Sequence, residues 1–328
     1  MIISKTPFRV SLAGGGSDFA EYYRQSAGHV VSVALNRHMY VTVNRRFDDT
    51  IRVSYTQTEI VGHVDDLQHD LIREALKMTG MTSGVEITTI ADLPAGIGLG
   101  SSSTLSVGVL NALYAMKGEW HSPADLARRA CEIEIDVLER PIGKQDQYIA
   151  AFGGIQDIRF EPDDTVVVHP VVCPKEAREQ LTSRLLLFFT GIQRDAGSVL
   201  KEARSRLVNG TSARSTVEGL VTMAGEVRHA MTSNRVDRLG PLLDAAWQVK
   251  KQMASGVSNG HLDDLYATAR RAGAVGGKIS GAGGGGCLLL FVEPDAQCAV
   301  RRAMTGRGLR EVPFAIDPEG SRIVHYSD

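Results

Sequence analysis

The sequence predicts an α+β protein with two lobes, and three observations support this. Strand patterns gather in the first part of the chain, and a run of helical patterns follows the middle. The chain has 328 residues, enough for two closely joined domains with real cores. Many of its 34 glycines lie in three short clusters, which indicates functional loops. We place the boundary near residues 170–184 and assign residues 1–178 to an N-terminal domain and 179–328 to a C-terminal domain.

The first half combines strands with helices. Apolar runs with short connections favour an antiparallel sheet, with strands at residues 2–12, 29–35, 38–46, 51–55 and 84–90. Helical spacing predicts a helix over residues 66–79, with Gly80 as its C-cap. Residues 101–116 are apolar and small, which predicts a buried helix. Residues 122–139 form the next helix, because Ser122 is a good N-cap and Pro123 suits a first turn.

The second half is dominated by helices. Strands are predicted at residues 184–190 and 287–292, and the tail offers one or two more. Helices are predicted at residues 196–207, 212–231, 235–254, 261–272 and 295–305. A glycine-rich segment, 273–286, separates two of these elements.

Composition narrows the class of protein. A net charge of −2 gives no electrostatic argument for nucleic acid or an anionic membrane as a partner. The most apolar runs have the length of strands and fall far short of a membrane span. The four cysteines form no Cys-x-x-Cys pair and no signal peptide precedes them, so we expect reduced thiols in the cytoplasm.

The strongest local signal is the loop at residues 94–103. Its sequence, Pro-Ala-Gly-Ile-Gly-Leu-Gly-Ser-Ser-Ser, places alternating glycines and then hydroxyl residues at a strand-to-helix junction. Glycines let the backbone approach an anion closely, and a helix start offers unpaired N–H groups and a favourable dipole. A plain glycine turn with an N-cap serine needs fewer glycines and hydroxyls than this. The loop therefore predicts a phosphate site.

A second loop, residues 278–287, contains a formal G-x-G-x-x-G match at Gly281, Gly283 and Gly286. A strand pattern follows it, whereas a dinucleotide-binding fingerprint needs a helix there. A Walker A loop is excluded as well, because Ala272 stands in place of its first glycine and Ile279 in place of its Ser or Thr. A flexible hinge fits poorly between two apolar segments. Backbone that passes close to another loop or a ligand is the better interpretation.

The third cluster is at residues 6–19, where a strand runs into three glycines and then Ser17-Asp18. Alone, this pattern is explained as well by a turn followed by a helix N-cap as by a functional loop.

The order and spacing of the three clusters resemble the GHMP kinase family, which includes galactokinase, homoserine kinase and mevalonate kinase. The first family motif matches residues 6–19, the phosphate loop P-x-G-x-G-L-G-S-S matches 94–102, and K-x-S-G-A-G-G-G matches 278–285. The resemblance covers nearly the whole chain. It implies an N-terminal domain of the ribosomal-protein S5 type and a C-terminal ferredoxin-like domain, with the active site in the cleft.

The first motif departs from the Gly-Glu-His-x-Asp of many family members. Gly-Gly-Gly-Ser-Asp at residues 14–18 resembles instead the branch of D-glycero-D-manno-heptose 7-phosphate kinases. The segments Gly-Lys-Gln-Asp-Gln-Tyr at 143–148, Phe-Gly-Gly at 152–154 and Thr-Gly-Ile-Gln-Arg at 190–194 also match that branch. These matches favour a kinase acting on an anomeric hydroxyl.

The resemblance implies ATP and Mg²⁺ as cofactors and a small-molecule sugar phosphate as the second substrate; a homodimer stays an open alternative. The residues implied to bind ATP are Pro94, Gly96, Gly98, Leu99, Gly100, Ser101, Ser102 and Ser103. Those implied to bind the sugar are Gly15, Gly16, Ser17, Asp18, Arg194, Gly281, Gly283 and Gly284.

The resemblance also implies catalytic and metal roles. Asp146 would take or orient the proton of the attacking hydroxyl, and Lys144 and Arg9 would keep it ionised and neutralise charge. For Lys144, an ordinary surface lysine is an equal alternative, and a clamp on the sugar phosphate together with Arg194 is another. Glu134 would bind Mg²⁺ with Ser102 or Ser103 beside it. Glu132 is the nearby competitor, and a solvated helix face is the alternative for both glutamates.

Three functional hypotheses follow. The first is an ATP-dependent kinase that phosphorylates O1 of a heptose 7-phosphate, in nucleotide-activated heptose synthesis for surface polysaccharide. The second is a GHMP kinase acting on a free sugar of the fucose, galactose or mannose type, or on another small alcohol. The third is a catalytically silent sensor that binds sugar and ATP. Intact loops together with Asp146 and Glu134 argue against the third.

Overall fold

The computed structural model describes residues 1–193 and 196–327, which form two sheets with helices around them. The strands of the larger sheet are β12 (Arg322–Tyr326), β1 (Ile2–Ala13), β2 (Gly28–Arg45), β5 (Val85–Ala91), β3 (Ile51–Ser54) and β4 (Thr58–Val61), in that spatial order. Two further strands extend from β2, namely β6 (Ile155–Phe160) and β7 (Val166–Pro170). The smaller sheet has the order β11 (Arg310–Glu311), β8 (Leu185–Phe189), β10 (Cys287–Val292) and β9 (Ala274–Ile279).

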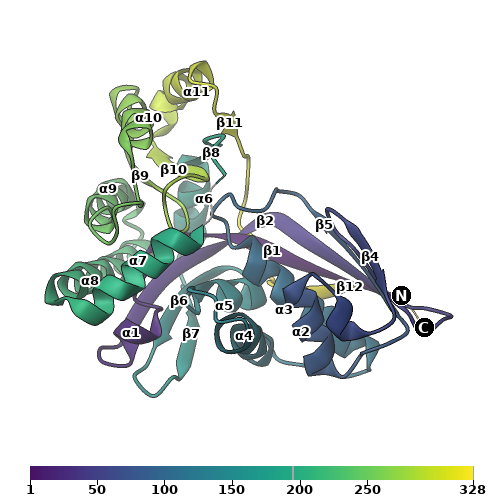
Figure 1. Cartoon of the computed structure of the whole chain (residues 1–328). Helices are drawn as coiled ribbons and strands as arrows, with labels where there is room; N and C mark the ends of the chain where they lie inside the picture. Colours follow the sequence, from purple (N-terminus) through teal and green to yellow (C-terminus); the bar gives the residue numbers. More distant parts are fainter. Residues whose placement is uncertain (194–195, 328) are drawn as a thin grey trace.

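Helices cover one face of the larger sheet and surround the smaller one (Figure 1). Those of the first half are α1 (Ala20–Tyr23), α2 (Asp70–Thr79), α3 (Ser101–Met116), α4 (Pro123–Cys131) and α5 (Gln145–Phe152), with the short turn η1 (Val64–Asp66) and the π-helical segment η2 (Glu132–Val137). Those of the second half are α6 (Lys175–Arg184), α7 (Ala196–Asn209), α8 (Thr211–Thr232), α9 (Leu239–Lys250), α10 (Gly260–Arg271) and α11 (Gln297–Gly306), with the turns η3 (Val236–Arg238) and η4 (Pro294–Ala296).

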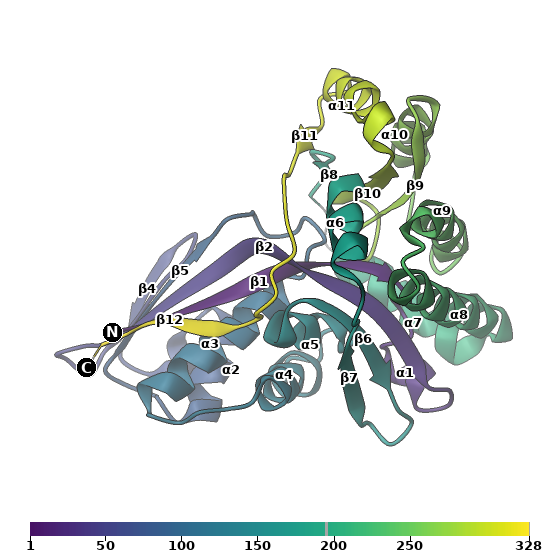
Figure 2. The same ribbon diagram turned by 180° about the vertical axis from the view of Figure 1, so that it is seen from behind.

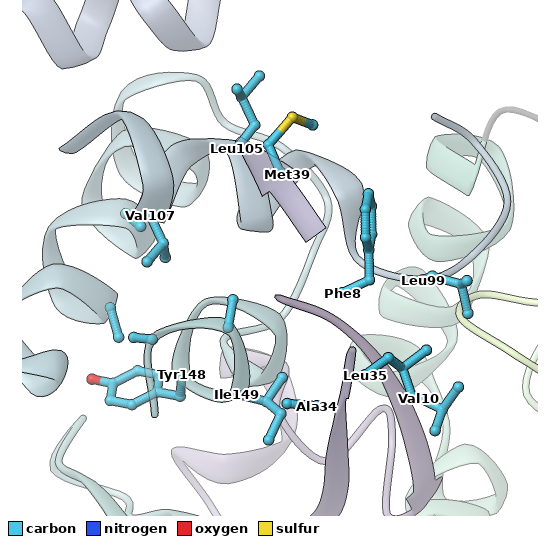
Figure 3. Packing of buried hydrophobic residues seen from close by; sticks show 14 of the residues in the cluster. Phe8, Val10, Ala34, Leu35, Met39, Leu99, Leu105, Val107, Tyr148 and Ile149 are labelled. Atoms are coloured by element: carbon cyan, nitrogen blue, oxygen red, sulfur yellow. The ribbon is translucent and has the colours of Figure 1, made fainter. Parts of the chain in front are cut away.

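Helix α3 is the central packing element of the first lobe. It is apolar on nearly all sides, as expected of a helix enclosed by other elements. Figure 3 draws side chains of β1, β2, α3 and α5 from this core, among them Phe8, Leu105 and Ile149, which belong to one buried hydrophobic cluster. This core fixes the start of α3 beside β1, which is where the phosphate loop lies.

The last strand returns to the first lobe. After β11 the chain runs back along the larger sheet, and β12 pairs antiparallel with β1 (Figure 2). The two ends of the chain therefore lie side by side, and the amino group of Met1 donates a 2.6 Å hydrogen bond to the carbonyl oxygen of Ser327. The division into residues 1–178 and 179–328 remains a prediction. It assigns β12 to the C-terminal domain, although β12 pairs with β1 of the N-terminal domain.

Several predicted elements need correction. Residues 29–35 and 38–46 belong to one long strand, β2, which pairs with β1 on both sides of an irregularity between Pro7 and Arg9; β6 flanks its first half and β5 its second. Strand β3 pairs parallel with β5, so the sheet is not wholly antiparallel. The helix predicted at residues 122–139 ends as α4 and continues as the π-helical segment η2. The sequence patterns missed α5, α6, β6, β7 and β9.

Candidate active site

The phosphate loop lies between β5 and α3 and borders a cleft of about 690 Å³. Gly96, Gly98, Gly100 and Ser101 to Ser103 line this cleft. Helix α3 begins at Ser101 after Gly100, and no side chain of the described residues caps its start. Uncapped N–H groups at a helix start, together with the helix dipole, form a ready site for an anion. The side chain of Leu99 is buried in the core instead, and Pro94 is not part of the cleft lining.

The glycine-rich loop at residues 278–287 packs directly against the phosphate loop. The amide of Cys287 donates a 3.0 Å hydrogen bond to the carbonyl oxygen of Ile97. A Cβ on Gly98 would lie 2.6 Å from the carbonyl oxygen of Ser280, and one on Gly281 would lie 2.8 Å from Cα of Gly98. The interpretation of this loop as a close backbone approach is confirmed by these contacts. The two lobes thus meet through glycines at the edge of the cleft.

This contact predicts different effects for two neighbouring glycines. Gly96 and Gly98 both have φ of 78°. Among the described residues, a Cβ at Gly96 meets no atom within 4 Å, whereas a Cβ at Gly98 meets backbone. Gly96→Ala should lower the free energy of unfolding by about 1–2 kcal/mol through backbone strain alone. Gly98→Ala should cost about 1–3 kcal/mol more, because it overpacks the contact with Ser280. Urea unfolding of both variants tests this, and equal losses would contradict the close contact.

Glu134 is fully buried and does not itself line the cleft; it lies behind Ser102, which does. The hydroxyl of Ser102 donates a hydrogen bond to its Oε1, and Nε2 of Gln147 donates to its Oε2 at 2.7 Å. Nη1 of Arg140 lies 3.6 Å from the same carboxylate. Nη2 of Arg140 donates to both carboxylate oxygens of Asp70 at 2.9 Å. Burial raises the pKa of Glu134, while hydrogen bonds from Ser102 and Ser103 and the charge of Arg140 oppose the rise.

This group of oxygens fits Mg²⁺. Magnesium prefers hard oxygen ligands and is usually held by one or two carboxylates together with substrate phosphates. One buried carboxylate beside the hydroxyls of Ser102 and Ser103, at the edge of a phosphate cleft, meets that requirement. Among the described residues no cluster of three His, Cys, Asp or Glu side chains could hold a metal by itself. Glu132 faces away from the cleft, with 48% of its side chain exposed and Arg128 4.0 Å away.

Asp146 lies in the first turn of α5 and is held by Arg9 of β1. Nε of Arg9 donates to Oδ1 at 2.7 Å, and its NH2 group donates to Oδ2 at 2.5 Å. The remaining nitrogen of Arg9 donates to the carbonyl oxygen of Gly98 at 2.7 Å. Arg9 therefore joins the candidate catalytic carboxylate to the phosphate loop, as the sequence predicted for a charge partner of Asp146.

Asp146 also lines a second, narrower cavity of about 90 Å³ next to the cleft. Asp18, Gly15 and Gly16 border it, as does Gln145. The amide of Gly16 donates to Oδ1 of Asp18 at 2.8 Å, and Nε2 of Gln145 donates to Oδ2 at 3.1 Å. Burial raises the pKa of Asp18, and the nearby Asp146 carboxylate adds to that rise. Two carboxylates facing one cavity are suited to bind hydroxyl groups.

Two polar atoms in this cavity have no hydrogen-bond partner among the described residues. They are Oγ of Ser11 and Oε1 of Gln145. Buried polar atoms without a partner are rare, and a ligand is one explanation for them. The cavity thus offers acceptors and donors to a polyhydroxylated molecule that would reach Asp146.

Lys144 does not face Asp146. Its ammonium lies 3.1 Å from Oδ1 of Asp164 and 4.8 Å from the ring centre of Tyr23, outside both cavities. Side chains two positions apart at a helix start point in different directions, which explains the separation from Asp146. This placement disagrees with the catalytic role and with the phosphate-clamp role that the sequence suggested for Lys144.

Of the other residues predicted to bind the sugar, some line a cavity and others hold the backbone of a loop in place. Gly281 borders both cavities, whereas Gly283 borders only the phosphate cleft. Ser17 is fully buried and holds its own loop, donating to the carbonyl oxygen of Gly14 at 2.8 Å. Gly284 borders neither cavity and donates from its amide to the carbonyl oxygen of Val257 at 2.8 Å. Arg194 lies outside the described residues.

Sequence patterns missed some side chains that line the cavities. Tyr55 and His69 face the phosphate cleft and contact each other edge to face, with ring centres 4.7 Å apart. Tyr55 directly follows β3, and His69 directly precedes α2. Arg140 borders the cleft too, and Lys250 of α9 borders the narrow cavity. No motif marks these residues, since each comes from a different element.

A phosphate-binding helix start, a buried carboxylate for a metal and a carboxylate paired with arginine together define a small-molecule kinase. Family models support this class: the GHMP kinases N terminal domain matches residues 67–154 and the GHMP kinases C terminal domain matches residues 227–309. The chain belongs to the GHMP kinase family.

The relatives of this chain include sugar kinases and mevalonate kinases. The chain is 30% identical to a D-glycero-alpha-D-manno-heptose 7-phosphate kinase of Campylobacter jejuni, over 97% of both proteins. It is 27% identical to a bifunctional fucokinase/GDP-fucose pyrophosphorylase of Arabidopsis thaliana, over 89% of this chain and 30% of that longer protein. A crystal structure named as a D-glycero-D-manno-heptose 1-phosphate kinase from Bacteroides thetaiotaomicron matches with a TM-score of 0.84 and 26% identity, over 100% of both chains.

Proposed function

We propose that this protein is an ATP-dependent sugar kinase that transfers the γ-phosphoryl group to O1 of D-glycero-D-manno-heptose 7-phosphate, giving the 1,7-bisphosphate. The observation that carries the proposal is the position of Asp146, which borders both the phosphate cleft and the narrow cavity lined by Asp18. A hydroxyl bound beside Asp18 would meet the nucleotide at Asp146. The heptose relatives support the choice of sugar.

The residues can be assigned steps in this reaction. The start of α3 and the phosphate loop would hold the β- and γ-phosphates, and Glu134 with Ser102 and Ser103 would hold Mg²⁺. The metal would neutralise charge on the phosphates when bound. Asp146 would accept or orient the proton of the attacking hydroxyl, and Arg9 keeps this carboxylate fixed next to Gly98.

The phosphate on the sugar needs its own partner. Lys144 points away from the narrow cavity, and Arg194 is not described. Among the described residues that line the cavity, the cationic ones are Arg9 and Lys250, and Arg9 is already paired with Asp146. The requirement for a 7-phosphate therefore rests on the heptose relatives.

A free sugar is the second candidate, because the chain is also similar to a fucokinase. ADP release should be followed with Mg²⁺–ATP and mannose, fucose, galactose, and the heptose with and without its 7-phosphate. We expect heptose 7-phosphate to give the highest kcat/KM. Turnover of an unphosphorylated sugar alone would contradict the choice of substrate and leave the kinase assignment intact.

The cellular setting is part of the same proposal. All four cysteines lie among the described residues and are free, which fits a reducing cytoplasm. No helix in the described ranges combines the length and apolarity needed to cross a bilayer. A homodimer stays an open alternative, which light scattering of the purified protein would decide.

A further inference from the structure

The narrow cavity contains a cation that the steps above do not use. Lys250 is the last residue of α9, and its side chain is only 9% exposed although it carries an ammonium group. It reaches the cavity wall that also contains Asp18 and Asp146. A buried lysine costs free energy unless its charge is used or compensated, so its position calls for an explanation.

The N–H donors of Arg9, Lys278 and Lys250 differ in how many protein acceptors they have. Arg9 gives its donors to Asp146 and to the carbonyl oxygen of Gly98. Lys278, which is also buried, donates to the carbonyl oxygens of Ser11 and Leu12 at 2.8 and 3.4 Å. Within the described residues the ammonium of Lys250 has one acceptor, the carbonyl oxygen of Gly281. Since an ammonium has three N–H groups, Lys250 retains donors for a ligand.

The charged groups around the narrow cavity also indicate a ligand-binding role for Lys250. Three cations, Arg9, Lys250 and Lys278, interact electrostatically in this region, and the carboxylates that face them are Asp18 and Asp146. Burial, together with the charge of Arg9, lowers the pKa of Lys250 to about 8. An incoming anion would oppose both effects and hold the lysine in its charged form.

We propose that Lys250 is a catalytic residue whose ammonium contacts the oxygens that carry negative charge while the phosphoryl group passes from ATP to the sugar hydroxyl. The inference rests on the proposed function. In this step a bond forms between the hydroxyl oxygen and the γ-phosphorus, and the bond from that phosphorus to the bridging oxygen breaks. The electron pair leaves with ADP, the hydroxyl proton passes to Asp146, and Lys250 keeps its protons.

A merely structural role is the competing explanation, since Lys250 also holds the loop at Gly281. Two variants separate the roles. Lys250→Met removes the charge and the hydrogen bond, while Lys250→Gln removes the charge and keeps a donor. Lys251→Met is the matched control, because the neighbouring Lys251 faces Asp263 at 3.4 Å and borders neither cavity.

The first measurement is turnover, with the acceptor sugar that the wild-type protein uses best in the panel. Both Lys250 variants should lose about 10²–10³-fold in kcat, as for the loss of one transition-state donor. The KM for ATP should stay within about threefold of the wild-type value, because ground-state binding is not affected. Lys251→Met should match the wild-type protein. If the preferred sugar is not heptose 7-phosphate, the substrate choice fails while Lys250 is still tested.

The second measurement needs no sugar. ADP with Mg²⁺ and aluminium fluoride mimics the transferring phosphoryl group and should raise the unfolding temperature of the wild-type protein more than ADP and Mg²⁺ alone. The Lys250 variants should keep the shift given by ADP and lose the extra shift. Their unfolding temperature without ligand should equal or exceed the wild-type value, because a buried charge is removed. Wild-type kcat in both variants, or a joint loss of unfolding temperature and ADP binding, would overturn the proposal.

Discussion

Asp146→Asn should lower kcat by about 10²–10⁴-fold, the usual contribution of a general base, with little change in ADP affinity. Asparagine keeps the shape of the side chain but cannot accept the proton of the attacking hydroxyl. ADP release gives kcat, and calorimetric titration gives the affinity for ADP. The replacement is better than alanine here, because the Arg9 side chain is only 6% exposed. Asparagine keeps an oxygen that can accept a hydrogen bond from Arg9, whereas Asp146→Ala would remove both acceptors.

Asp164→Asn is the control for this experiment. Asp164 pairs with Lys144 and Arg24 outside both cavities, and its φ of 70° is one that asparagine tolerates. This variant should keep wild-type kcat. An Asp146→Asn protein with kcat within about threefold of wild type would exclude Asp146 as the proton acceptor.

The phosphate loop could be predicted from sequence because its chemistry is local. Glycines that allow close approach and hydroxyl residues at a helix start are adjacent in the chain, so one segment carries the whole signal. The pairing of Arg9 with Asp146 needed the family resemblance, because these residues are 137 positions apart. Their contact depends on how β1 packs against α5, which no local pattern encodes.

Lys250 and Arg140 could not be predicted for the same reason. Each comes from an element whose pattern indicates only a helix or its end, and each reaches its cavity through tertiary packing. Lys144 is two positions from Asp146 in the sequence, but its ammonium contacts Asp164 instead, so proximity in sequence does not give proximity in space. The strand β12 was only partly anticipated, since pairing of the last residues with β1 joins the two ends of the chain.

The choice between Glu132 and Glu134 shows where sequence reasoning ends. Both residues lie in one helical segment, and residue type alone left either free to face solvent or metal. The chain forms a π-helical turn over this segment. The two glutamates are two positions apart and leave the helix in different directions, so Glu134 is fully buried beside Ser102 whereas Glu132 is exposed.

Glu134→Gln should therefore impair the reaction through the metal, lowering kcat by about 10²-fold and raising the Mg²⁺ concentration for half-maximal rate by about tenfold or more. The amide has nearly the shape of the carboxylate and can still accept a hydrogen bond from Gln147, so the fold should be kept. Rates of ADP release over a Mg²⁺ titration measure both effects. Glu132→Gln is the matched control from the same turn and should titrate like the wild-type protein.

The alternative role for Glu134 is to hold Arg140 and Ser102 in place without binding a metal. In that case Glu134→Gln would lower the unfolding temperature and kcat while the Mg²⁺ dependence stayed unchanged. Mn²⁺ adds a second distinction, because it binds nitrogen and oxygen donors more readily than Mg²⁺ does. Partial recovery of the Glu134→Gln rate in Mn²⁺, with none for Asp146→Asn, would assign the metal to Glu134 and the proton to Asp146.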